Sequence, residues 1–322
     1  MIHMKAMVIT NFGSPEVFAE QEVDKPTLNK NEVLVKVYAT SVNPADCGIR
    51  QGMFGPRVKL PAILGYDVSG VVEAIALDVK DFQVGDEVYY AIDLLAGNGA
   101  NAEYHVANEA IIAKKPTNIS HLEAASVPVA GGTAWAALIT KANIKIGETV
   151  LIHGGAGGVG TFAIQIAKAA GAYVYTTCGG YDIDFVKSIG ADKAIDYRRE
   201  NFVDIIMKET GGQGVDVTLS TVSGELLAQS LMVIKTDGRA VTVTGVQGDL
   251  NAAIFKNITI HFVHLDRTRP KLEALKTLIE QSQIKPVVGM TFPLNQVAQA
   301  HKKLEQGGEG VRGKIVVQVA NC

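Results

Sequence analysis

The chain has 322 residues, a length that normally folds as two domains, each large enough to bury its own core. Hydrophobic residues make up 47% and charged residues 20%, which is typical of globular proteins and excludes a disordered chain. The formal net charge of −3 gives no electrostatic reason to expect nucleic acid or an anionic membrane as a partner.

The cysteines and the start of the chain bear on its compartment. The sequence has three widely spaced cysteines, which form neither a disulfide framework nor a C-x-x-C metal motif: Cys47, Cys178 and Cys322. The first residues, MIHMKAMVITNFG, lack the apolar core of a secretory signal. The longest apolar stretch, 122–139, is interrupted by a glutamate, a proline and two glycines and is too short to span a bilayer. We therefore expect a soluble cytoplasmic protein.

Short β-type segments alternate with turns over roughly the first 120 residues. The segment 32–38, EVLVKVY, alternates polar and apolar residues as a half-exposed antiparallel strand does. Further strands are expected over 5–10, 68–76, 87–92, 103–106 and 111–113. Many short strands with little helix predict a barrel or a partly open sandwich.

The pattern changes near Ser120, which is suited to cap a helix with Glu123 three residues later. The helical region runs on through 133–142. From Thr149 on, strands near 149–153, 172–177, 193–195, 215–219, 239–244 and 258–263 alternate with helices near 159–170, 182–189, 201–210 and 224–233. Six strands joined by crossovers predict an α/β fold with a doubly wound parallel sheet.

The end of the chain resembles its beginning more than its middle. Helices near 271–281 and 296–305 are followed by a strand over 314–319, which we expect to return to the first domain. The predicted division is therefore 1–124 for the first, β-rich domain, 125–265 for the parallel-sheet domain and 266–322 for the segment that returns to the first domain.

A glycine-rich loop follows the first strand of the parallel sheet. Gly155, Gly157 and Gly160 form G-x-G-x-x-G between the apolar run 149–153 and the helix expected over 159–170. In such a motif the first glycine allows a tight turn, the second lets the backbone approach a pyrophosphate, and the third lets the helix pack against the strand. The amides and the positive dipole end of the helix would face the phosphates. We expect a dinucleotide site that involves Gly155, Ala156, Gly157, Gly158, Val159 and Gly160.

Ordered motifs along nearly the whole chain identify a family. They include SVNPADCGIRQG at 41–52, LGYDVSGVV at 64–72, EAASVPVAGGTAWAAL at 123–138, IGETVLIHGGAGGVG at 146–160 and GVDVTLSTVSG at 214–224. The sequence resembles zinc-independent members of the medium-chain dehydrogenase/reductase superfamily, close to quinone oxidoreductases and zeta-crystallin. The resemblance implies a GroES-like first domain, a Rossmann second domain and a cleft between them.

The same alignment argues against a catalytic metal. Zinc-dependent relatives bind their metal with a Cys, a His and a further Cys or acidic residue, and Ala45, Tyr66 and Val129 stand at those places here. Alanine and valine have no donor atom, and neutral tyrosine is a poor zinc ligand. Cys47 lies two residues beyond the first ligand position, and we interpret it as a small buried thiol. The four-cysteine structural zinc lobe is also missing.

Without a metal, a reduced nicotinamide can pass hydride to an acceptor that is already polarised by conjugation. The resemblance therefore implies an NADPH-dependent reductase of a quinone or an α,β-unsaturated carbonyl. Its catalytic residues are expected to be Asn43, which would touch the nicotinamide or the substrate, and Tyr66, which would donate a hydrogen bond or a proton to the product. The alternative for Tyr66 is simple packing against the substrate.

The substrate pocket is expected to include Tyr66 together with Asp46, Phe54 and Leu95. Asp46 matches a polar position of the family, and it has a second interpretation as a residue that holds its loop by pairing with Arg50.

The residue at the end of the second strand decides which dinucleotide binds. NAD-preferring Rossmann domains place a carboxylate there to bind the ribose hydroxyls. Here the position is Thr177, followed by Cys178, so no carboxylate would repel a 2′-phosphate. Tyr197 matches a tyrosine that lines the adenosine phosphate in relatives, and Arg198 beside it is a candidate cation. NADP(H) is therefore favoured, with NAD(H) as the alternative.

Further cofactor contacts follow from the resemblance at the ends of the later strands. They are expected at Thr133, Ser220, Thr221, Gly245, Val246, Phe262 and Val263. His153, His261 and His264 are interpreted as strand residues, not as catalysts.

Two other functions stay open on the sequence alone. One is an enoyl-type reductase that acts on longer acyl chains, and the other is a non-enzymatic, crystallin-like protein that binds NADPH. The lack of a basic cluster argues against RNA binding by such a protein. Relatives commonly form a homodimer through the Rossmann edge, which the sequence neither supports nor opposes.

Overall fold

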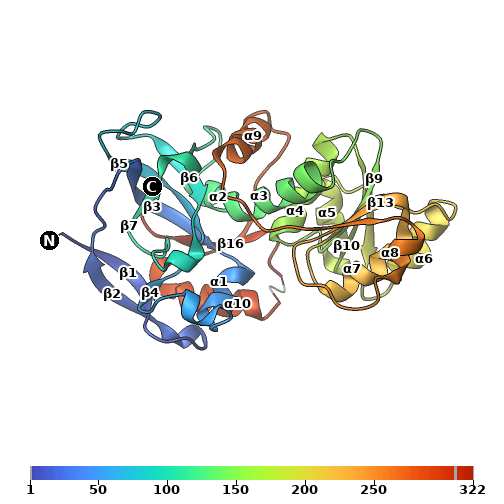
Figure 1. The fold of residues 1–322 in the computed structure, drawn as a ribbon, viewed down its shortest axis with the longest axis horizontal. Helices are drawn as coiled ribbons and strands as arrows, with labels where there is room; N and C mark the ends of the chain where they lie inside the picture. The colour runs from blue at the N-terminus through green and yellow to red at the C-terminus, as the bar shows by residue number, and fades with distance from the viewer. Residues whose placement is uncertain (1, 308–309, 322) are drawn as a thin grey trace. The chain divides into compact units, whose positions relative to one another are not determined.

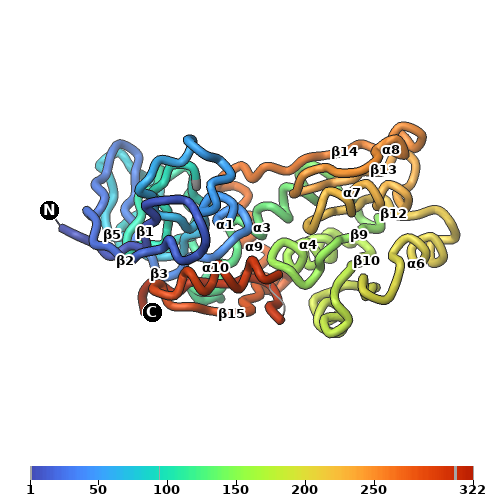
Figure 2. Tube along the Cα trace, turned by 90° about the horizontal axis from the view of Figure 1, so that it is seen from below, coloured from blue at the N-terminus to red at the C-terminus, as the bar shows by residue number. Residues whose placement is uncertain are grey.

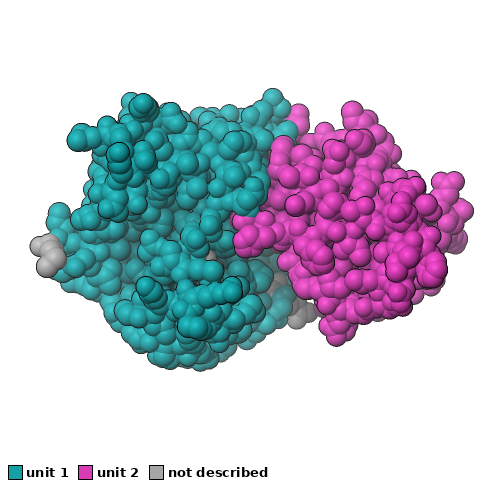
Figure 3. Space-filling model, viewed as in Figure 1, with its two compact units in different colours: residues 1–129, 266–281, 286–322 teal, residues 130–265, 282–285 magenta. Residues whose placement is uncertain are grey.

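The computed structural model describes residues 2–307 and 310–321, which form two compact units (Figure 3). Unit 1 consists of Met1–Val129, Asp266–Gln281 and Pro286–Cys322, and unit 2 consists of Ala130–Leu265 and Ser282–Lys285. The predicted domain boundaries after residues 124 and 265 stay a prediction. No helix among the described residues is both long and apolar enough to cross a membrane.

Unit 1 is built on two sheets. The smaller sheet has the strand order β2-β1-β4, from Phe18–Asp24, His3–Ile9 and Ala62–Ile63. The larger sheet has the order β15-β16-β3-β5-β6-β8, with β7 paired to β3. Its strands are β15 (Val288–Pro293), β16 (Lys314–Gln318), β3 (Glu32–Val42), β5 (Asp67–Ile75), β6 (Glu87–Ala91), β8 (Ala113–Lys114) and β7 (Tyr104–Asn108).

The central strand β3 is longer and more buried than its sequence pattern indicates. It pairs with β5, β7 and β16, and most of its side chains on both faces are buried. The pairing with β16 is antiparallel and sets Ile315 opposite Val42, so a strand from the last part of the chain joins the larger sheet beside β3.

The helices of unit 1 come from both ends of the chain. They are α1 (Pro44–Arg50), α2 (His121–Ala125), α9 (Arg269–Glu280) and α10 (Val297–Glu305). Helix α10 packs on α1, and Figure 2 shows this red segment beside the blue one. The predicted cap of α2 is confirmed, because Ser120 Oγ accepts from Glu123 N at 3.2 Å and the Glu123 carboxylate accepts from Ser120 N at 2.9 Å.

Unit 2 contains a six-stranded, wholly parallel sheet of order β11-β10-β9-β12-β13-β14 (Figure 1). The strands are β9 (Thr149–His153), β10 (Tyr173–Cys178), β11 (Lys193–Asp196), β12 (Val215–Ser220), β13 (Ile234–Thr242) and β14 (Thr259–Phe262). This order is that of a doubly wound Rossmann sheet, so the predicted fold class is confirmed. Its helices are α4 (Gly158–Ala169), α5 (Ile183–Ser188), α6 (Phe202–Glu209), α7 (Gly224–Ser230) and α8 (Asn251–Phe255).

The chain passes from unit 1 to unit 2 within α3 (Pro128–Trp135). A π-helical stretch, Ala136–Lys141, continues it, so the predicted helical region 133–142 is real but not a regular α-helix. Helices α1 and α8 and strands β2, β4 and β15 were not predicted. Helix α8 and strand β4 are short, β2 is mostly polar and exposed, and α1 and β15 each contain a glycine and a proline, so no hydrophobic period is recognised in these segments.

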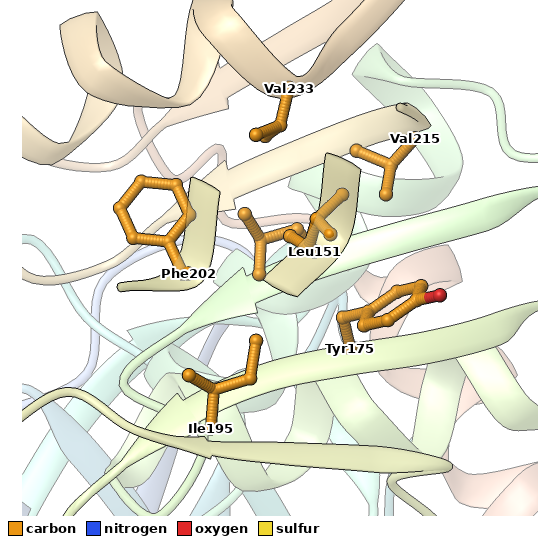
Figure 4. Packing of buried hydrophobic residues seen from close by; sticks show 7 residues of the cluster. Leu151, Tyr175, Ile195, Phe202, Val215 and Val233 are labelled. Atoms are coloured by element: carbon orange, nitrogen blue, oxygen red, sulfur yellow. The ribbon is translucent and has the colours of Figure 1, made fainter. Parts of the chain in front are cut away.

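Buried side chains on one face of the parallel sheet form a core cluster (Figure 4). The cluster contains Leu151, Tyr175, Ile195, Phe202, Ile206, Val215 and Val233. Strands β9, β10, β11 and β12 and helix α6 all contribute to it. Because its members come from consecutive β–α crossovers, this cluster holds in place the strand ends that carry the candidate cofactor loops.

Ile195 tests this core against a matched surface isoleucine. Ile195 is fully buried, whereas Ile254 on α8 is 75% exposed. We expect Ile195→Ala to lower the free energy of unfolding by about 2–5 kcal/mol, because the substitution leaves a cavity that the sheet cannot close. Ile254→Ala should change it by less than about 0.5 kcal/mol. Urea unfolding followed by circular dichroism measures both, and equal losses would contradict this description of the core.

Candidate dinucleotide and substrate sites

The turn after β9 depends on Gly154 and Gly155, for different reasons. Gly154 has φ of +74°, a left-handed conformation, so it is the turn residue. Gly155 was expected to fill that role, but its φ is ordinary. A Cβ at Gly155 would lie well under 3.0 Å from the Thr176 hydroxyl. The first glycine of the motif is therefore required by the close approach of the loop to β10.

The other two motif glycines differ in what surrounds them. A Cβ at Gly160 would lie well under 3.0 Å from the carbonyl oxygen of Gly154, so the first turn of α4 rests directly on the loop backbone. A Cβ at Gly157 would meet only that same oxygen, at 3.4 Å. The packing among described residues thus gives no reason for a glycine at 157, which leaves a surface open to an approaching ligand.

The start of α4 fits a pyrophosphate. Gly157 is its N-cap and supplies no side-chain hydrogen bond to the first-turn amides. These amides and the positive end of the helix dipole are suited to bind an anion. The predicted members Ala156, Gly158 and Val159 lie in the same loop and first turn, and all three are partly exposed. The residues present therefore fit a dinucleotide.

The last two residues of β10 are buried. Thr177 and Cys178 are 4% and 3% exposed. The Thr177 hydroxyl lies 3.1 Å from His153 Nδ1 and accepts from Gly154 N at 3.3 Å. Burial raises the pKa of the Cys178 thiol to about 11, so it is neutral. The cofactor contacts predicted at Thr177 and Cys178 stay a prediction.

An aromatic and cationic cluster follows β11. The guanidinium carbon of Arg198 lies 5.6 Å from the ring centroid of Tyr181 and 5.7 Å from that of Tyr197. Both tyrosines are half exposed. Asp196 is buried, and it accepts from the Arg198 amide at 3.1 Å. A Cβ at Gly180 would lie 2.6 Å from the Asp196 carboxylate, which explains that glycine. Sequence reasoning missed Tyr181, although it is an aromatic residue in the loop after the second strand.

Apart from Thr133, which lies on α3, the remaining cofactor candidates lie at or just beyond the carboxyl ends of β12, β13 and β14. These ends share one edge of the parallel sheet, where open α/β sheets bind their ligands. Ser220 Oγ donates to Ser223 O at 2.8 Å, and Thr221 Oγ1 donates to His153 O at 2.7 Å, so each of the two hydroxyls shapes its loop. The others are partly or well exposed: Thr133, Gly245, Val246, Phe262 and Val263.

A fully buried polar cluster occupies the centre of unit 1. The amide nitrogen of Asn43 donates to Asp46 Oδ2 at 3.1 Å and to Asp67 Oδ2 at 2.9 Å. Lys314 Nζ donates to Asn43 Oδ1 and to Val42 O, the latter at 2.9 Å. Both N–H bonds of the Asn43 amide are thus used inside unit 1, and its predicted contact with nicotinamide or substrate stays a prediction. Asp67 and Lys314 were missed, because nothing in the sequence pairs residues so far apart.

The predicted pairing of Asp46 with Arg50 is wrong. Asp46 accepts from Asn43 N at 2.8 Å and from Gly65 N at 3.2 Å, so its carboxylate caps its own helix. Arg50 pairs with Glu305 on α10. The reason is that the unpaired amides of the first turn of α1 are nearer to Asp46 than the guanidinium is. Asp46 is fully buried, and this burial raises the pKa of its carboxyl to about 7.

Tyr66 precedes β5 directly and is 9% exposed. Burial raises the pKa of its phenol, and the Arg267 guanidinium beside it acts in the opposite direction. Arg267 also donates to Ile92 O at 3.4 Å and to Asp93 Oδ2 at 3.2 Å. Arg267 is a cationic neighbour of Tyr66 that sequence reasoning missed, because it lies about 200 residues further along the chain.

The remaining pocket candidates, Phe54 and Leu95, and the thiol of Cys47 differ in how far they are buried. Phe54 and Leu95 are half buried, at the start of the short helix Gly55–Arg57 and within Leu94–Ala96. Cys47 Sγ lies 3.4 Å from His301 Nδ1. Burial raises the pKa of this thiol to about 12, which agrees with its interpretation as a buried, unreactive group.

One arrangement of side chains resembles the machinery of another reaction, but its serine is buried. Ser69 Oγ lies 2.8 Å from His121 Nδ1, and His121 Nε2 lies 3.2 Å from Glu87 Oε1, which resembles a hydrolytic triad. Ser69 is fully buried and so unable to reach a substrate. Within the part of the chain that the structure describes, no three His, Cys, Asp or Glu side chains are grouped so that they could hold a metal ion.

Known proteins match the chain over almost its full length. Family models match at residues 29–117, described as alcohol dehydrogenase GroES-like domain, and at 189–317, described as zinc-binding dehydrogenase. Quinone oxidoreductase of Homo sapiens is 32% identical, covering 98% of this chain and 97% of the human protein. 2-Methylene-furan-3-one reductase of Solanum lycopersicum is 35% identical, covering 98% of this chain and 79% of that protein. The structure of the quinone oxidoreductase from Coxiella burnetii has a TM-score of 0.91 and 34% identity, covering 99% of this chain and all of that one.

Serine substitutions at the two motif glycines separate binding from folding. Serine is a good N-cap, so Gly157→Ser should leave the thermal midpoint unchanged or higher. It should also weaken dinucleotide binding by about tenfold or more, because its side chain occupies the surface that a pyrophosphate approaches. Gly160→Ser, the matched control, should lower the thermal midpoint, because its Cβ clashes with Gly154 O. Wild-type affinity in a folded Gly157→Ser protein would exclude this loop as the pyrophosphate site.

Asp46 should make unit 1 less stable as the pH rises. Its carboxyl pKa is 3.8 when exposed and about 7 when folded, so between these values the folded protein holds a proton that the unfolded chain has lost. Stability is then lost as the pH rises through this window, with a slope of at most about 1.4 kcal/mol per pH unit.

The measurement is urea unfolding from pH 4 to 8 for the wild type, Asp46→Asn and Asp24→Asn. Asp24 is 64% exposed, so its variant should keep the wild-type slope. Asp46→Asn should lose this one-proton component, whatever its absolute stability. His105 and His301, whose pKa values burial lowers, titrate with the opposite sign in all three proteins and cancel in the comparison. Parallel curves for Asp46→Asn and wild type would contradict the expectation.

Proposed function

Because the chain belongs to the quinone oxidoreductases of the medium-chain dehydrogenase/reductase family, we propose that it is an NADPH-dependent reductase of a quinone or an α,β-unsaturated carbonyl. The observation that carries the proposal is the open backbone at Gly157 on the amino end of α4, in a chain that matches such oxidoreductases throughout. The Solanum lycopersicum relative, named as a reductase of an unsaturated ketone, supports the second substrate class.

When bound, the reduced nicotinamide supplies the hydride, and the residues of the chain bind, orient and polarise. Hydride addition to a conjugated carbonyl or quinone leaves negative charge on an oxygen, which a hydrogen-bond donor stabilises. The phenol of Tyr66, kept neutral by burial, is the proposed donor. The buried cluster holds the residues on either side of Tyr66, because Asp46 accepts from Gly65 N and Asp67 accepts from Asn43. Proton transfer to the product follows from the same hydroxyl or from water.

The proposed cofactor is NADP(H), not NAD(H). Support comes from the cluster of Tyr181, Tyr197 and Arg198, which offers a guanidinium and two aromatic rings beside the end of β11. Arginine is suited to bind a 2′-phosphate through charge-assisted hydrogen bonds. Metal independence is proposed from the residue types Ala45, Tyr66 and Val129 at the places where zinc relatives have ligands. A cytoplasmic location is proposed because the cysteines are widely spaced and form no disulfide framework, which suits a reducing compartment.

The test is steady-state oxidation of NADPH and of NADH with 1,4-benzoquinone and with a simple enone, before and after treatment with a chelator. We expect faster turnover with NADPH and no effect of chelation. Arg198→Gln should raise the KM for NADPH about tenfold or more, because it removes a charge-assisted contact. It should leave the KM for NADH nearly unchanged.

Arg199→Gln is the matched control, since the Arg199 side chain is 87% exposed and next in sequence. It should affect neither cofactor by more than about twofold. Tight NADPH binding without turnover on either acceptor would favour the non-enzymatic alternative. Activity lost to the chelator would overturn metal independence, and a preference for NADH would overturn the proposed role of Arg198.

A further inference from the structure

A buried imidazole connects three elements of unit 2 beside the glycine turn. His153, the last residue of β9, is fully buried. Its Nδ1 lies 3.1 Å from the hydroxyl of Thr177 on β10, and its Nε2 lies 2.9 Å from the hydroxyl of Ser230 on α7. The ring of Phe202 meets the imidazole edge to face, with centroids 4.8 Å apart. Both ring nitrogens thus have a partner, and the ring is held in one orientation.

The direction of each hydrogen bond follows from the number of protons available. Ser230 Oγ donates its one proton to Leu226 O at 2.5 Å, so it accepts from His153 Nε2–H. Burial lowers the pKa of His153 to about 4, so the ring is neutral and Nδ1 is an acceptor. Thr177 therefore donates to Nδ1, and its hydroxyl oxygen accepts from Gly154 N at 3.3 Å. The same N–H also donates to the backbone oxygen of Thr177 at 3.1 Å. All the bonds run one way, from the Gly154 amide to the Leu226 carbonyl.

This chain of hydrogen bonds ends on the residue that makes the turn. Gly154 is the left-handed residue on which Gly160 and the first turn of α4 rest. The carbonyl oxygen of His153 accepts from the Thr221 hydroxyl at 2.7 Å, which adds the loop after β12. His153 therefore joins the connections after β9, β10 and β12, all within one unit and all on the edge where the dinucleotide is proposed to bind.

We propose that His153 is a positioning residue for the dinucleotide, which holds the glycine turn in its binding conformation by linking Thr177 to Ser230 on α7. The inference rests on the proposed dinucleotide site. It has two consequences. The Thr177 hydroxyl acts on the imidazole, not on the ribose. Ser230, which is fully buried and on α7, influences dinucleotide affinity without touching the ligand.

A double-mutant cycle on the full-length protein tests the link. The dissociation constant of NADPH is measured by fluorescence titration for Thr177→Val, Ser230→Ala and the double variant. Each single variant should weaken binding about three- to tenfold, the worth of one hydrogen bond. The double variant should bind about as weakly as the weaker single one, because both substitutions break the same chain. Thr177→Ser, which keeps the hydroxyl, should restore affinity.

Thr218→Val is the matched control. Thr218 is a buried threonine on β12, and its hydroxyl has no hydrogen-bond partner among the described residues. Its variant should leave NADPH affinity unchanged. Thermal unfolding of every variant shows whether the affected proteins are folded at the temperature of the titration. Loss of stability with unchanged affinity in both Thr177→Val and Ser230→Ala would mean that the hydrogen bonds have only a structural role, and it would overturn the proposal.

The outcomes separate this proposal from the proposed function. If only Thr177→Val weakens binding and Ser230→Ala does not, Thr177 acts directly on the ligand and the proposal is wrong, while the reductase stands. If the wild type binds neither NADPH nor NADH, both this proposal and the proposed function are wrong. Nitrogen-15 NMR of the imidazole is an independent readout: a neutral ring with its proton on Nε2 is expected, and a proton on Nδ1 or a cationic ring at neutral pH would contradict the chain of bonds.

Discussion

The buried carboxylate of Asp67 is the interaction on which the organisation of unit 1 depends. It accepts from Ser41 Oγ at 2.5 Å, from Asn43 Nδ2 at 2.9 Å and from Val129 N at 2.8 Å, and Lys314 Nζ lies 3.9 Å away. Burial raises the pKa of Asp67, and these partners oppose the shift. A buried charge that loses a partner is strongly destabilising, so four separate segments are held to one another by one group. The chain must therefore return to its first domain, because Lys314 lies on the last strand.

In unit 2 the loops at the strand ends are held in place by uncharged groups. Its loops leave strand ends where backbone amides must stay free for a ligand, so the loops are held from behind by neutral groups, such as the hydroxyls of Thr221 and Thr177 and the imidazole of His153. Close backbone contact at Gly160 completes the support. A charged group behind the loop would compete with the pyrophosphate or repel it, whereas neutral donors and acceptors fix the geometry and leave the field of the α4 dipole to the ligand.

The sequence predicted what depends on local pattern. The parallel strands β9 to β12 were placed within a residue or two, because buried strands read as apolar runs and their turns carry glycine. It did not predict Lys314 beside Asn43, Arg267 beside Tyr66 or Tyr181 beside Arg198, because each pair is brought together only by the fold. The mispairing of Asp46 with Arg50 has the same origin: closeness in the sequence suggested the pair, but an unpaired helix start and the distant Glu305 were better partners.

The residues at the places where zinc-dependent relatives have their ligands lie next to the buried cluster, and this bears on why the cluster is so well connected. Ala45 and Tyr66, at two former ligand positions, are followed directly by Asp46 and Asp67, and the amide of Val129, at the third, donates to Asp67. In a zinc enzyme the metal fixes its ligands and polarises the substrate. Here, in the proposed reaction, both tasks pass to hydrogen bonds, which are directional and act only if their donors are held still. A phenol that must polarise an oxygen therefore requires a backbone held by a group like Asp67, and the two carboxylates beside the former ligand positions meet that requirement through Asn43 and Lys314.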